Sequence, residues 1–472
     1  MSTSTRPTVG VLRGHSWRCP HRIFDGFDSP IKLEATRWDA LCTNSLYRNI
    51  KHSVTTALSW DQVLEYIIEP LGMLPPPDTC KRSYHSLVYS GAYINQLKSR
   101  MSRFHARDPV YTMQYMWNRA RSGIFVSIRN SRLELFVPFC NVNYTNTWTS
   151  DARAVLPKKH LPPDRWWSNG WMLCEKCPSN FIGDTWVTTI GNMLMSACNE
   201  GMYDMDFIVN KRDTPCVRLD GADPMNPLDV NLPNLVDVSA LIPVLSFYTG
   251  SEYADVPMPH PVDWQRVTGK CFAQASVRPP VQQRPDVYWE HKAPIAVFRG
   301  SMTGIGTCSR TNQRAYLCSL QNDNLDARLT GSNSRFKVDP FTRGIFSAQR
   351  DITTGGFMDM NEQQENFRYG LCIDGHSAVD RMGGLFNGRQ AILKVASPNC
   401  ALAPHAWLSD FLHAWEHYVP VSANLSDLDA SICWLQENDK CAQGMASRCA
   451  YMNKHYLCAA AMTDWWRLLS SL

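Results

Sequence analysis

Short apolar runs alternate with helix-like stretches along much of the chain. Residues 181–197 (FIGDTWVTTIGNMLMSA) predict a helix, because apolar residues recur there at spacings of three, four and one and form one face. That face consists of Ile182, Trp186, Ile190, Leu194 and Met195. Short buried strands are predicted at DFIVN (206–210), within VSALIPVLSF (238–247), and at APIAVF (293–298), AILKVA (391–396) and HYVPV (417–421). This alternation is typical of parallel α/β layers.

A last helix is predicted to open at Ser426 and Asp429, a weaker form of the capping box, and to bury Leu428, Ile432 and Leu435. Proline clusters at 74–77 (LPPP) and 279–285 (PPVQQRP) interrupt the pattern. Between the clusters and after the second one, strands and helices alternate, so the sequence predicts two α/β units with a cleft between them. Ligands of such sheets bind beyond the carboxyl ends of the strands, which directs attention to the residues that follow each strand.

Composition narrows the class of protein. The chain has 472 residues, of which 44% are hydrophobic and 19% charged, so it can bury a large core and is not disordered throughout. Its formal net charge of +4 argues against a protein that coats nucleic acid. The 16 Trp and 29 Pro favour irregular loops and aromatic-lined surfaces over a helical bundle.

No targeting or membrane segment stands out in the sequence. The first residues lack the basic stretch and apolar run of a signal peptide, no run of about 18 apolar residues predicts a transmembrane helix, and the last residues carry no retention signal. Among 17 cysteines, only Cys174 and Cys177 form a C-x-x-C pair. A zinc site needs a second pair or two histidines at ligand spacing. We therefore expect buried, reduced thiols and a cytoplasmic location.

The segment RGSMTGIGTCSRTNQR (299–314) follows a predicted strand and carries groups that suit a phosphate. Ser301 and Thr303 offer hydroxyls, and Arg314 stands at the start of the next predicted helix. Glycine lets the backbone approach a ligand, and free N–H groups together with a guanidinium bind phosphate well. The segment lacks the third glycine of the dinucleotide fingerprint, and the chain has no G-x-x-x-x-G-K-[ST] motif. An ordinary strand-to-helix turn is therefore the alternative.

A second segment, CIDGHSAVDRMGGLFNGRQAILK (372–394), offers similar chemistry. Gly375 precedes a predicted helix whose first turns include Ser377 and Arg381. An anion at this helix N-terminus would meet free N–H donors and the Arg381 guanidinium together. The alternative is that Arg381 pairs with Asp380 or with another surface carboxylate.

A third polar cluster, NKRD (210–213), follows a buried strand and precedes SFYTGSEYADVPMPHPVDW (246–264). By itself it predicts either the wall of a cleft or a solvated turn. The order of motifs is more specific: NKRD-x-P, SEYxDxxxP…W, FRGSxT…R, G-x(5)-R with a lysine-bearing strand, and HYVPV-x(3)-LSDL. In this order they resemble glycosyltransferase family 90 over about residues 165–455. That family includes fungal capsule-associated proteins and protein O-glucosyl- and O-xylosyltransferases.

The resemblance implies an α/β fold of the GT-B type, in which two Rossmann-like domains face a cleft that holds a nucleotide sugar, usually a UDP-sugar. It implies an acceptor-side domain over 116–285, a donor-binding domain over 286–455, and a C-terminal helix over 456–472 that packs back on the first domain. Residues 1–115 are an extension or module of unknown role. The implied reaction is an inverting, metal-independent transfer of a sugar, glucose or xylose first, to a hydroxyl of a glycan or glycoprotein.

Residue by residue, the resemblance implies a donor site and a cleft lining. The donor-binding loop corresponds to Ser301, Thr303 and Arg314, and the arginine that contacts the diphosphate corresponds to Arg381. The backbone beside the nucleoside corresponds to Gly375, His376, Ser377 and Ala378. Positions near the cleft correspond to Asp213, Glu252 and Tyr253. Arg314, Arg381 and a helix N-terminus would stabilise the leaving nucleoside diphosphate in place of a metal ion.

The chain departs from the family pattern in two respects. Secreted members carry signal and retention sequences, whereas this chain resembles a cytosolic version, such as those encoded by large DNA viruses or microbes; a viral member would act in the host cytoplasm. Some members also place a catalytic Asp just before a Cys, upstream of the NKRD strand. The nearest carboxylates here are Asp164 and Glu175, and neither falls at the matching place. We assign Asp164 as the general base, with a capping or solvated aspartate as the alternative.

No cofactor is expected besides the UDP-sugar donor, and no metal. A metal-dependent transferase of the GT-A type needs D-x-D at the end of a strand. Asp204-x-Asp206 comes before an apolar run, and Asp427-x-Asp429 opens a helix. Two other functions stay open. One is a catalytically inactive homologue that binds glycan or nucleotide in a structural role. The other is a nucleic-acid-binding protein, suggested by LPKKH (156–160), although the overall charge and the lack of a recognised motif weigh against it.

Overall fold

The computed structural model describes residues 56–78, 84–142, 171–173, 184–212, 215–221, 236–268, 288–303, 309, 312–320, 322–331, 336–338, 354–375, 377–397 and 405–472. They belong to two compact units, and each is described by itself. Unit 1 contains the described residues of 278–457 together with 171–173, and unit 2 contains those of 15–149, 176–277 and 458–472. Both units have an α/β architecture, as predicted.

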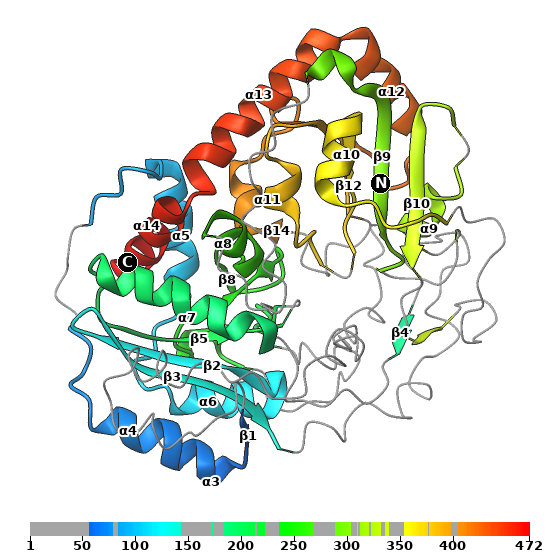
Figure 1. The fold of residues 1–472 in the computed structure, drawn as a ribbon. Coiled ribbons are helices and arrows are strands. Elements are labelled where there is room, and N and C mark those ends of the chain that lie inside the picture. The colour runs from blue at the N-terminus through cyan, green and yellow to red at the C-terminus, as the bar shows by residue number, and fades with distance from the viewer. Residues whose placement is uncertain are drawn as a thin grey trace, which may run out of the picture. The chain divides into compact units, whose positions relative to one another are not determined.

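Unit 1 is built on a sheet of five parallel strands in the order β10-β9-β12-β13-β15 (Figure 1). The strands are β9 (Ala293–Ser301), β10 (Leu325–Gly331), β12 (Phe367–Cys372), β13 (Ala391–Val395) and β15 (Tyr418–Val421). The first strand in the chain, β9, thus lies between the second and the third. The chain that leaves β9 continues to β10 on one side, and the chain that leaves β12 continues to β13 on the other side. The β9–β12 junction is therefore the topological switch point, where ligands bind in sheets of this kind.

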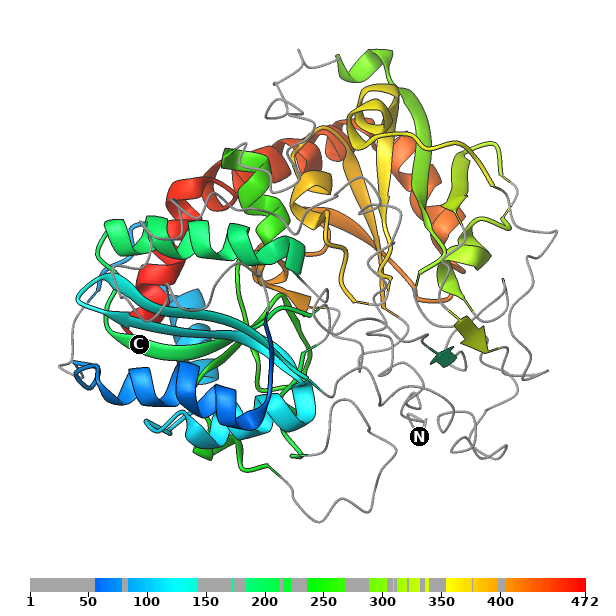
Figure 2. The ribbon, with the colours of Figure 1, turned by 60° about the horizontal axis from the view of Figure 1, so that its bottom comes forward.

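Helices cover both faces of this sheet. On one face, alternate residues such as Phe298, Leu371 and Leu393 form a single core with the buried sides of α9 (Gln313–Leu317), α12 (Leu428–Glu437) and α13 (Asp439–Tyr456). The opposite face is covered by α10 (Met360–Asn366) and α11 (Met382–Leu385) (Figure 2). Short strands β11 (Phe336–Val338) and β4 (Trp171–Leu173) pair antiparallel in the same unit, which also contains β14 (His405–Ala406).

Unit 2 is built on a six-stranded mixed sheet in the order β1-β3-β2-β5-β6-β8. Its strands are β1 (Thr56–Leu58), β2 (Ser122–Arg129), β3 (Arg132–Asn141), β5 (Met205–Asn210), β6 (Val244–Ser246) and β8 (Val256–Pro257). A short strand β7 (Tyr248–Thr249) also belongs to this unit. Strand β2 runs antiparallel to both of its neighbours, and the other pairs are parallel. The purely parallel layer predicted for this half of the chain is therefore wrong, because the β2–β3 hairpin enters the sheet.

The helices of unit 2 come from distant parts of the chain. They are α3 (Trp60–Val63), which continues through a wider turn into α4 (Glu69–Gly72), then α5 (Gly91–Met101), α6 (Val110–Tyr115), α7 (Asp184–Asn199), α8 (Pro261–Thr268) and the C-terminal α14 (Ala459–Ser470). Helix α14 lies against α7 and α8 (Figure 1). It buries Trp465 and Trp466 completely, and the Trp465 Nε1 donates to the Tyr93 hydroxyl over 2.8 Å. The last residues thus complete the core of unit 2.

The predicted strands are all present, and the predicted helices need two corrections. Helix α7 exists, with Ile190 and Leu194 fully buried, but Trp186 and Met195 are only half-buried. Helix α12 buries its predicted face, yet its N-cap is Asp427 and no side chain caps it, so the predicted capping box is wrong. Asp427 instead accepts hydrogen bonds from the amide and hydroxyl of Ser422. Among the described helices, none combines the length and apolar character needed to cross a membrane.

Candidate functional site

The carboxyl ends of β9 and β12 bring together two segments that are about 70 residues apart in the sequence. Strand β9 ends at Ser301, followed by Thr303, and β12 leads into Asp374 and Gly375. The approach is close, because a Cβ placed on Gly375 would lie 2.5 Å from the Thr303 Oγ1. Only glycine fits at this position without displacing the threonine. The two segments whose residues suit phosphate binding therefore meet at the topological switch point.

Arg314 fastens these two strand ends to each other. It is the second residue of α9, as predicted, and is 8% exposed. Its Nε, Nη1 and Nη2 donate to the carbonyl oxygens of Asp374 (3.1 Å), Ser301 (3.1 Å) and Ile373 (2.9 Å). Burial, with the nearby Arg381, lowers the pKa of the Arg314 guanidinium to about 10. Because three of the five N–H donors of an arginine are committed to the backbone here, Arg314 primarily fixes the geometry of the site.

Arg381 reaches the same place from the other side of the Gly375 turn. Its Nη2 donates to the Arg299 carbonyl over 2.7 Å, and a Cβ placed on Gly300 would lie 3.3 Å from that nitrogen. Within the described residues, the Arg381 guanidinium makes no other hydrogen bond, and no ion pair joins it to the exposed Asp380. Arg381 therefore keeps most of its N–H donors available for an anion beside the strand ends.

The segment between Gly375 and Arg381 forms a turn. The Gly375 amide donates to the Ser377 carbonyl over 3.1 Å, and both Ser377 and Ala378 are buried. Helix α11 begins only at Met382, with Arg381 as its N-cap residue. The helix that was predicted to open directly after Gly375 is therefore wrong. A helix of one turn offers little aligned dipole, so the hydrogen-bond donors at this place are those of the Arg381 side chain and the turn. His376 lies outside the described residues.

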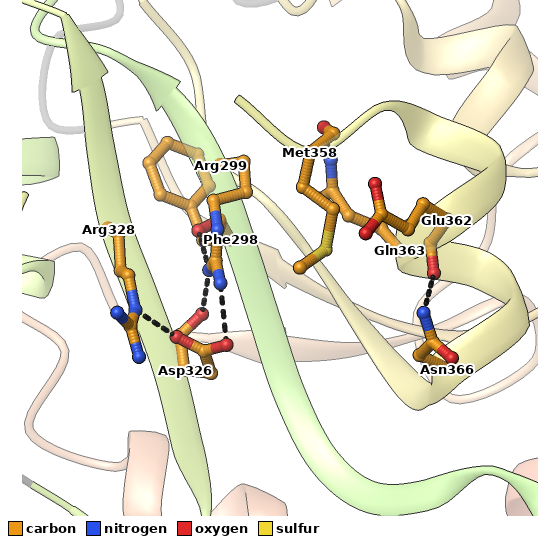
Figure 3. A network of polar contacts seen from close by, with 8 residues as sticks. All are labelled: Phe298, Arg299, Asp326, Arg328, Met358, Glu362, Gln363 and Asn366. Carbon is orange, nitrogen blue, oxygen red and sulfur yellow. Dashed lines mark hydrogen bonds and ion pairs between the residues drawn. The ribbon is translucent and has the colours of Figure 1, made fainter. Parts of the chain in front are cut away.

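A charge network beside the site holds β9 to β10 (Figure 3). Arg299 Nη2 donates to the Asp326 Oδ2 over 2.6 Å, and Arg328 Nε donates to the Oδ1 of the same carboxylate over 2.7 Å. Burial opposes ionisation of Asp326, but the two guanidinium groups lower the pKa of its carboxyl below the ordinary value. The network fixes the backbone of Arg299, whose carbonyl in turn accepts from Arg381.

Two charged side chains at this site were missed by the sequence reasoning. Asp374 is 8% exposed, and its Oδ2 has no hydrogen-bond partner in the described part of the chain. Burial raises the pKa of its carboxyl to about 6, although Lys394 and Arg314 act in the opposite direction. Burial, the largest single influence, disfavours the ammonium form of Lys394, but Asp374 together with Cys372 and Tyr418 raises the pKa of Lys394 overall. The sequence offered two signals: a carboxylate directly after one buried strand, and a lysine inside the next buried strand of the sheet.

In unit 2, polar side chains lie at the ends of β5 and β6 and directly before β8. Asn210 Nδ2 donates to the Ser246 Oγ over 3.0 Å, and Ser246 donates to the fully buried Asp255. Asp255 also accepts from the amides of Cys216 (2.9 Å) and Val217 (2.7 Å), and burial raises the pKa of its carboxyl to about 6. Asp255 therefore ties a loop to the strand ends, a role that sequence reasoning did not assign.

Of the residues expected to line the cleft, Glu252 and Tyr253 lie in this loop region of unit 2. The Glu252 carboxylate is 3.8 Å from the Arg218 guanidinium. The carbonyl oxygen of the buried Tyr253 accepts a hydrogen bond from the Arg103 Nη1 over 3.1 Å. Both therefore have structural contacts within unit 2. Asp213 and the proposed base Asp164 lie outside the described residues, as do Cys174, Cys177 and the basic segment 156–160.

The two D-x-D sequences are engaged in local structure. Both oxygens of Asp206 bind the guanidinium of Arg129 at 2.8 Å, and Asp204 accepts from the amide of Asn130 over 2.7 Å. Asp427 binds Ser422, as described above. No group of three or more His, Cys, Asp or Glu side chains in the described ranges is arranged to hold a metal ion.

Comparison with known proteins identifies the family. The model of the family described as "Glycosyl transferase family 90" matches residues 184–471, more than half of the chain. This chain belongs to glycosyl transferase family 90. The matched region includes both strand ends of the switch point and the polar cluster of unit 2.

Several relatives of this chain are viral proteins. The chain is 29% identical to "Uncharacterized protein 035R" of Invertebrate iridescent virus 3, over 75% of this chain and 35% of that protein. It is 28% identical to "Uncharacterized protein 027R" of Frog virus 3, over 70% of this chain and 38% of that protein. The chain thus spans little more than a third of these viral relatives. It is also 27% identical to Protein O-glucosyltransferase 1 of Homo sapiens, over 57% of this chain and 62% of that protein.

Proposed function

We propose that this family 90 member is an inverting glycosyltransferase that moves a sugar, glucose or xylose first, from a UDP-sugar to a hydroxyl of a glycan or protein. Membership of the family and the likeness to protein O-glucosyltransferases support the reaction class. We further propose that units 1 and 2 are the donor-side and acceptor-side domains of a GT-B enzyme. The α/β architecture of each unit supports this assignment.

The observation that carries the proposal is the convergence of Arg381, Thr303 and the Gly375 turn at the β9–β12 junction. A parallel sheet with this strand order binds its ligand at the switch point, and Arg381 offers guanidinium donors there. Thr303, Ser377 and the Gly375 turn surround the same point. This arrangement suits the diphosphate of a nucleotide sugar, since a guanidinium binds phosphate oxygens through paired N–H groups.

In the proposed reaction, the acceptor oxygen forms a bond to the anomeric carbon while the bond from that carbon to the β-phosphate oxygen breaks. The electron pair of the broken bond stays on the diphosphate, whose charge increases. The acceptor proton passes to a general base, for which Asp164 is our candidate. Arg381 stabilises the charge on the leaving group from a site already fixed by Arg314, so little reorganisation is required during the reaction.

Calorimetric titration with UDP tests the diphosphate site. Replacement of Arg381 by Ala should weaken UDP binding by about 2 kcal/mol, or about 30-fold, because a charge-assisted contact is lost. Arg381→Lys should recover only part of this loss, since lysine cannot bind two oxygens at once. Arg448→Ala, which removes an exposed arginine of α13 outside the charge network, is the matched control and should leave the affinity unchanged. Equal affinity of Arg381→Ala and the parent chain would eliminate the diphosphate role.

Turnover assays test the chemical step. We propose that no metal is required, so activity should survive chelation; complete loss that is restored by manganese would refute this. Asp164→Asn should remove transfer while UDP binding persists. The departure of the Asp164 region from the family pattern favours one other candidate, an inactive homologue that only binds nucleotide or glycan. Binding of UDP-sugars without transfer or hydrolysis in the parent chain would establish that candidate.

A further inference from the structure

A carboxylate and an ammonium group lie beside the donor site without contacting each other. Asp374 follows β12 directly, and Lys394 lies on β13 opposite Cys372, which points to the same face of the sheet as Asp374. Each of the two charges is one of the main influences on the pKa of the other group, yet no ion pair or hydrogen bond joins them. Within the described residues, Lys394 Nζ has no hydrogen-bond partner and lies 5.7 Å from the ring centroid of Tyr418.

This arrangement lowers the stability of the folded protein when no ligand is bound. A buried polar atom without a hydrogen bond loses its hydration and gains nothing in return. The Oδ2 of Asp374 is such an atom, although the backbone of the same residue is held by Arg314. The carboxylate cannot swing away to water, because its residue is fixed between β12 and the Gly375 turn. The Val379 amide donates to the Asp374 carboxylate, but the buried Oδ2 has no partner among the described residues, and this unused acceptor indicates a partner that arrives with the ligand.

The charges define which ligand group fits. A phosphate is an acceptor only, and Asp374 would repel it, so the phosphates belong beside Arg381. A neutral group with a donor and an acceptor side by side would satisfy Asp374 and Lys394 together. In a UDP-sugar, such groups are the imide edge of the uracil ring and the hydroxyls of the ribose or of the transferred sugar.

We propose that Asp374 and Lys394 bind a neutral donor–acceptor group of the nucleotide sugar and thereby select the donor substrate. In this arrangement Asp374 Oδ2 accepts an N–H or O–H of the ligand, and Lys394 Nζ donates to the adjacent oxygen. The inference rests on the proposed function, because it assigns a partner to the same site. It adds two specificity residues to a site whose phosphate contacts are made elsewhere.

The test is calorimetric titration of the full chain with UDP, CDP, 2′-deoxy-UDP and UDP-glucose. The variants are Asp374→Asn and Lys394→Met, and their folding is checked by thermal unfolding. Each should weaken binding of UDP-glucose by at least about tenfold, as expected for a hydrogen bond to a charged group. The matched controls are Asp380→Asn and Lys440→Met, which change exposed charges of the same type and should keep the parent selectivity.

Selectivity identifies the source of the group. Contact with uracil predicts that the parent chain prefers UDP over CDP by at least about tenfold and that both variants lose this preference, because cytosine reverses the donor and acceptor at its N3 edge. Contact with the ribose predicts that the parent alone discriminates against 2′-deoxy-UDP. Contact with the transferred sugar predicts variants that bind UDP normally and lose only the additional affinity for UDP-glucose.

The direction of the change separates a contact from a general charge effect. If Asp374 acted only as a negative charge near the diphosphate, Asp374→Asn would bind every nucleotide more tightly. Tighter or unchanged binding with parental selectivity in both variants overturns the inference and leaves the proposed function standing. Failure of the parent chain to bind any of the four ligands overturns the proposed function, and the inference falls with it.

Discussion

The buried Asp374 carboxylate, whose Oδ2 has no hydrogen-bond partner among the described residues, predicts a measurable dependence of stability on pH. Burial raises the pKa of this carboxyl from the ordinary 3.8 to about 6 in the folded chain. At about 1.4 kcal/mol for each pH unit, this difference corresponds to about 3 kcal/mol of folding free energy. Asp374→Asn keeps the shape of the side chain and removes the titration.

The sign follows from proton binding. A carboxyl whose pKa is higher in the folded chain binds more protons when folded, so its contribution to stability falls as the pH rises. Below about pH 4 the carboxyl is protonated in both the folded and the unfolded parent chain, so the variant should be as stable as the parent. Above about pH 6 both forms are ionised, and the parent should be less stable than Asp374→Asn by up to about 3 kcal/mol.

Thermal unfolding between pH 4 and pH 8 measures this difference. For a unit of this size, the expected gain in the melting temperature of the variant is roughly 6–12 °C at pH 8 and close to zero at pH 4. The pKa of Asp255 is also raised to about 6, but this residue is present in both chains, so its contribution to stability cancels in the comparison. The exposed Asp380→Asn should follow the parent at every pH. Parallel curves for Asp374→Asn and the parent would refute the idea of an uncompensated buried charge.

Three further substitutions test the packing of the two units. Gly375→Ala should reduce UDP affinity at least about tenfold, because the new methyl group must displace Thr303; unchanged titration curves would contradict this. Gly388→Ala should lower the free energy of unfolding by about 2–4 kcal/mol in urea titrations, since φ is +90° and a Cβ would lie 2.7 Å from the backbone of α13; a loss below about 1 kcal/mol would show that the helix can shift. Asp206→Ala should cost about 3–5 kcal/mol in the same assay, because it leaves the Arg129 guanidinium buried without its carboxylate, and a variant as stable as the parent would count against that pairing.

Local pattern in the sequence was sufficient for most of the elements of unit 1. Runs such as AILKV and YVPV are apolar at nearly every position, which is typical of strands in a buried parallel sheet, and both are strands of that sheet. The β2–β3 hairpin of unit 2 was not predicted. Its strands are buried along almost their full length, so they lack the alternation that separates a half-exposed strand from other apolar runs.

Part of the candidate site could likewise be predicted from the sequence, and part could not. Glycines and arginines after strands pointed to the segments around Thr303 and Gly375, because special backbone geometry and phosphate chemistry leave local signs in a sequence. The distinction between Arg314, which is bound to three carbonyls, and Arg381, which keeps free donors, was not visible, since both are a single arginine near a turn. Hydrogen-bond partners are set by atoms from other strands.

The sequence by itself therefore determined the α/β class, the positions of the parallel strands and the family, because each depends on residue types at short spacing or in a fixed order. Only the tertiary structure decided the strand order that makes the β9–β12 junction a switch point, and only it showed that no ion pair joins Asp374 to Lys394 and that the buried Asp374 Oδ2 lacks a hydrogen-bond partner among the described residues. The physical reason is that burial and pairing of a charge depend on which distant segments surround it, and that information is created by packing.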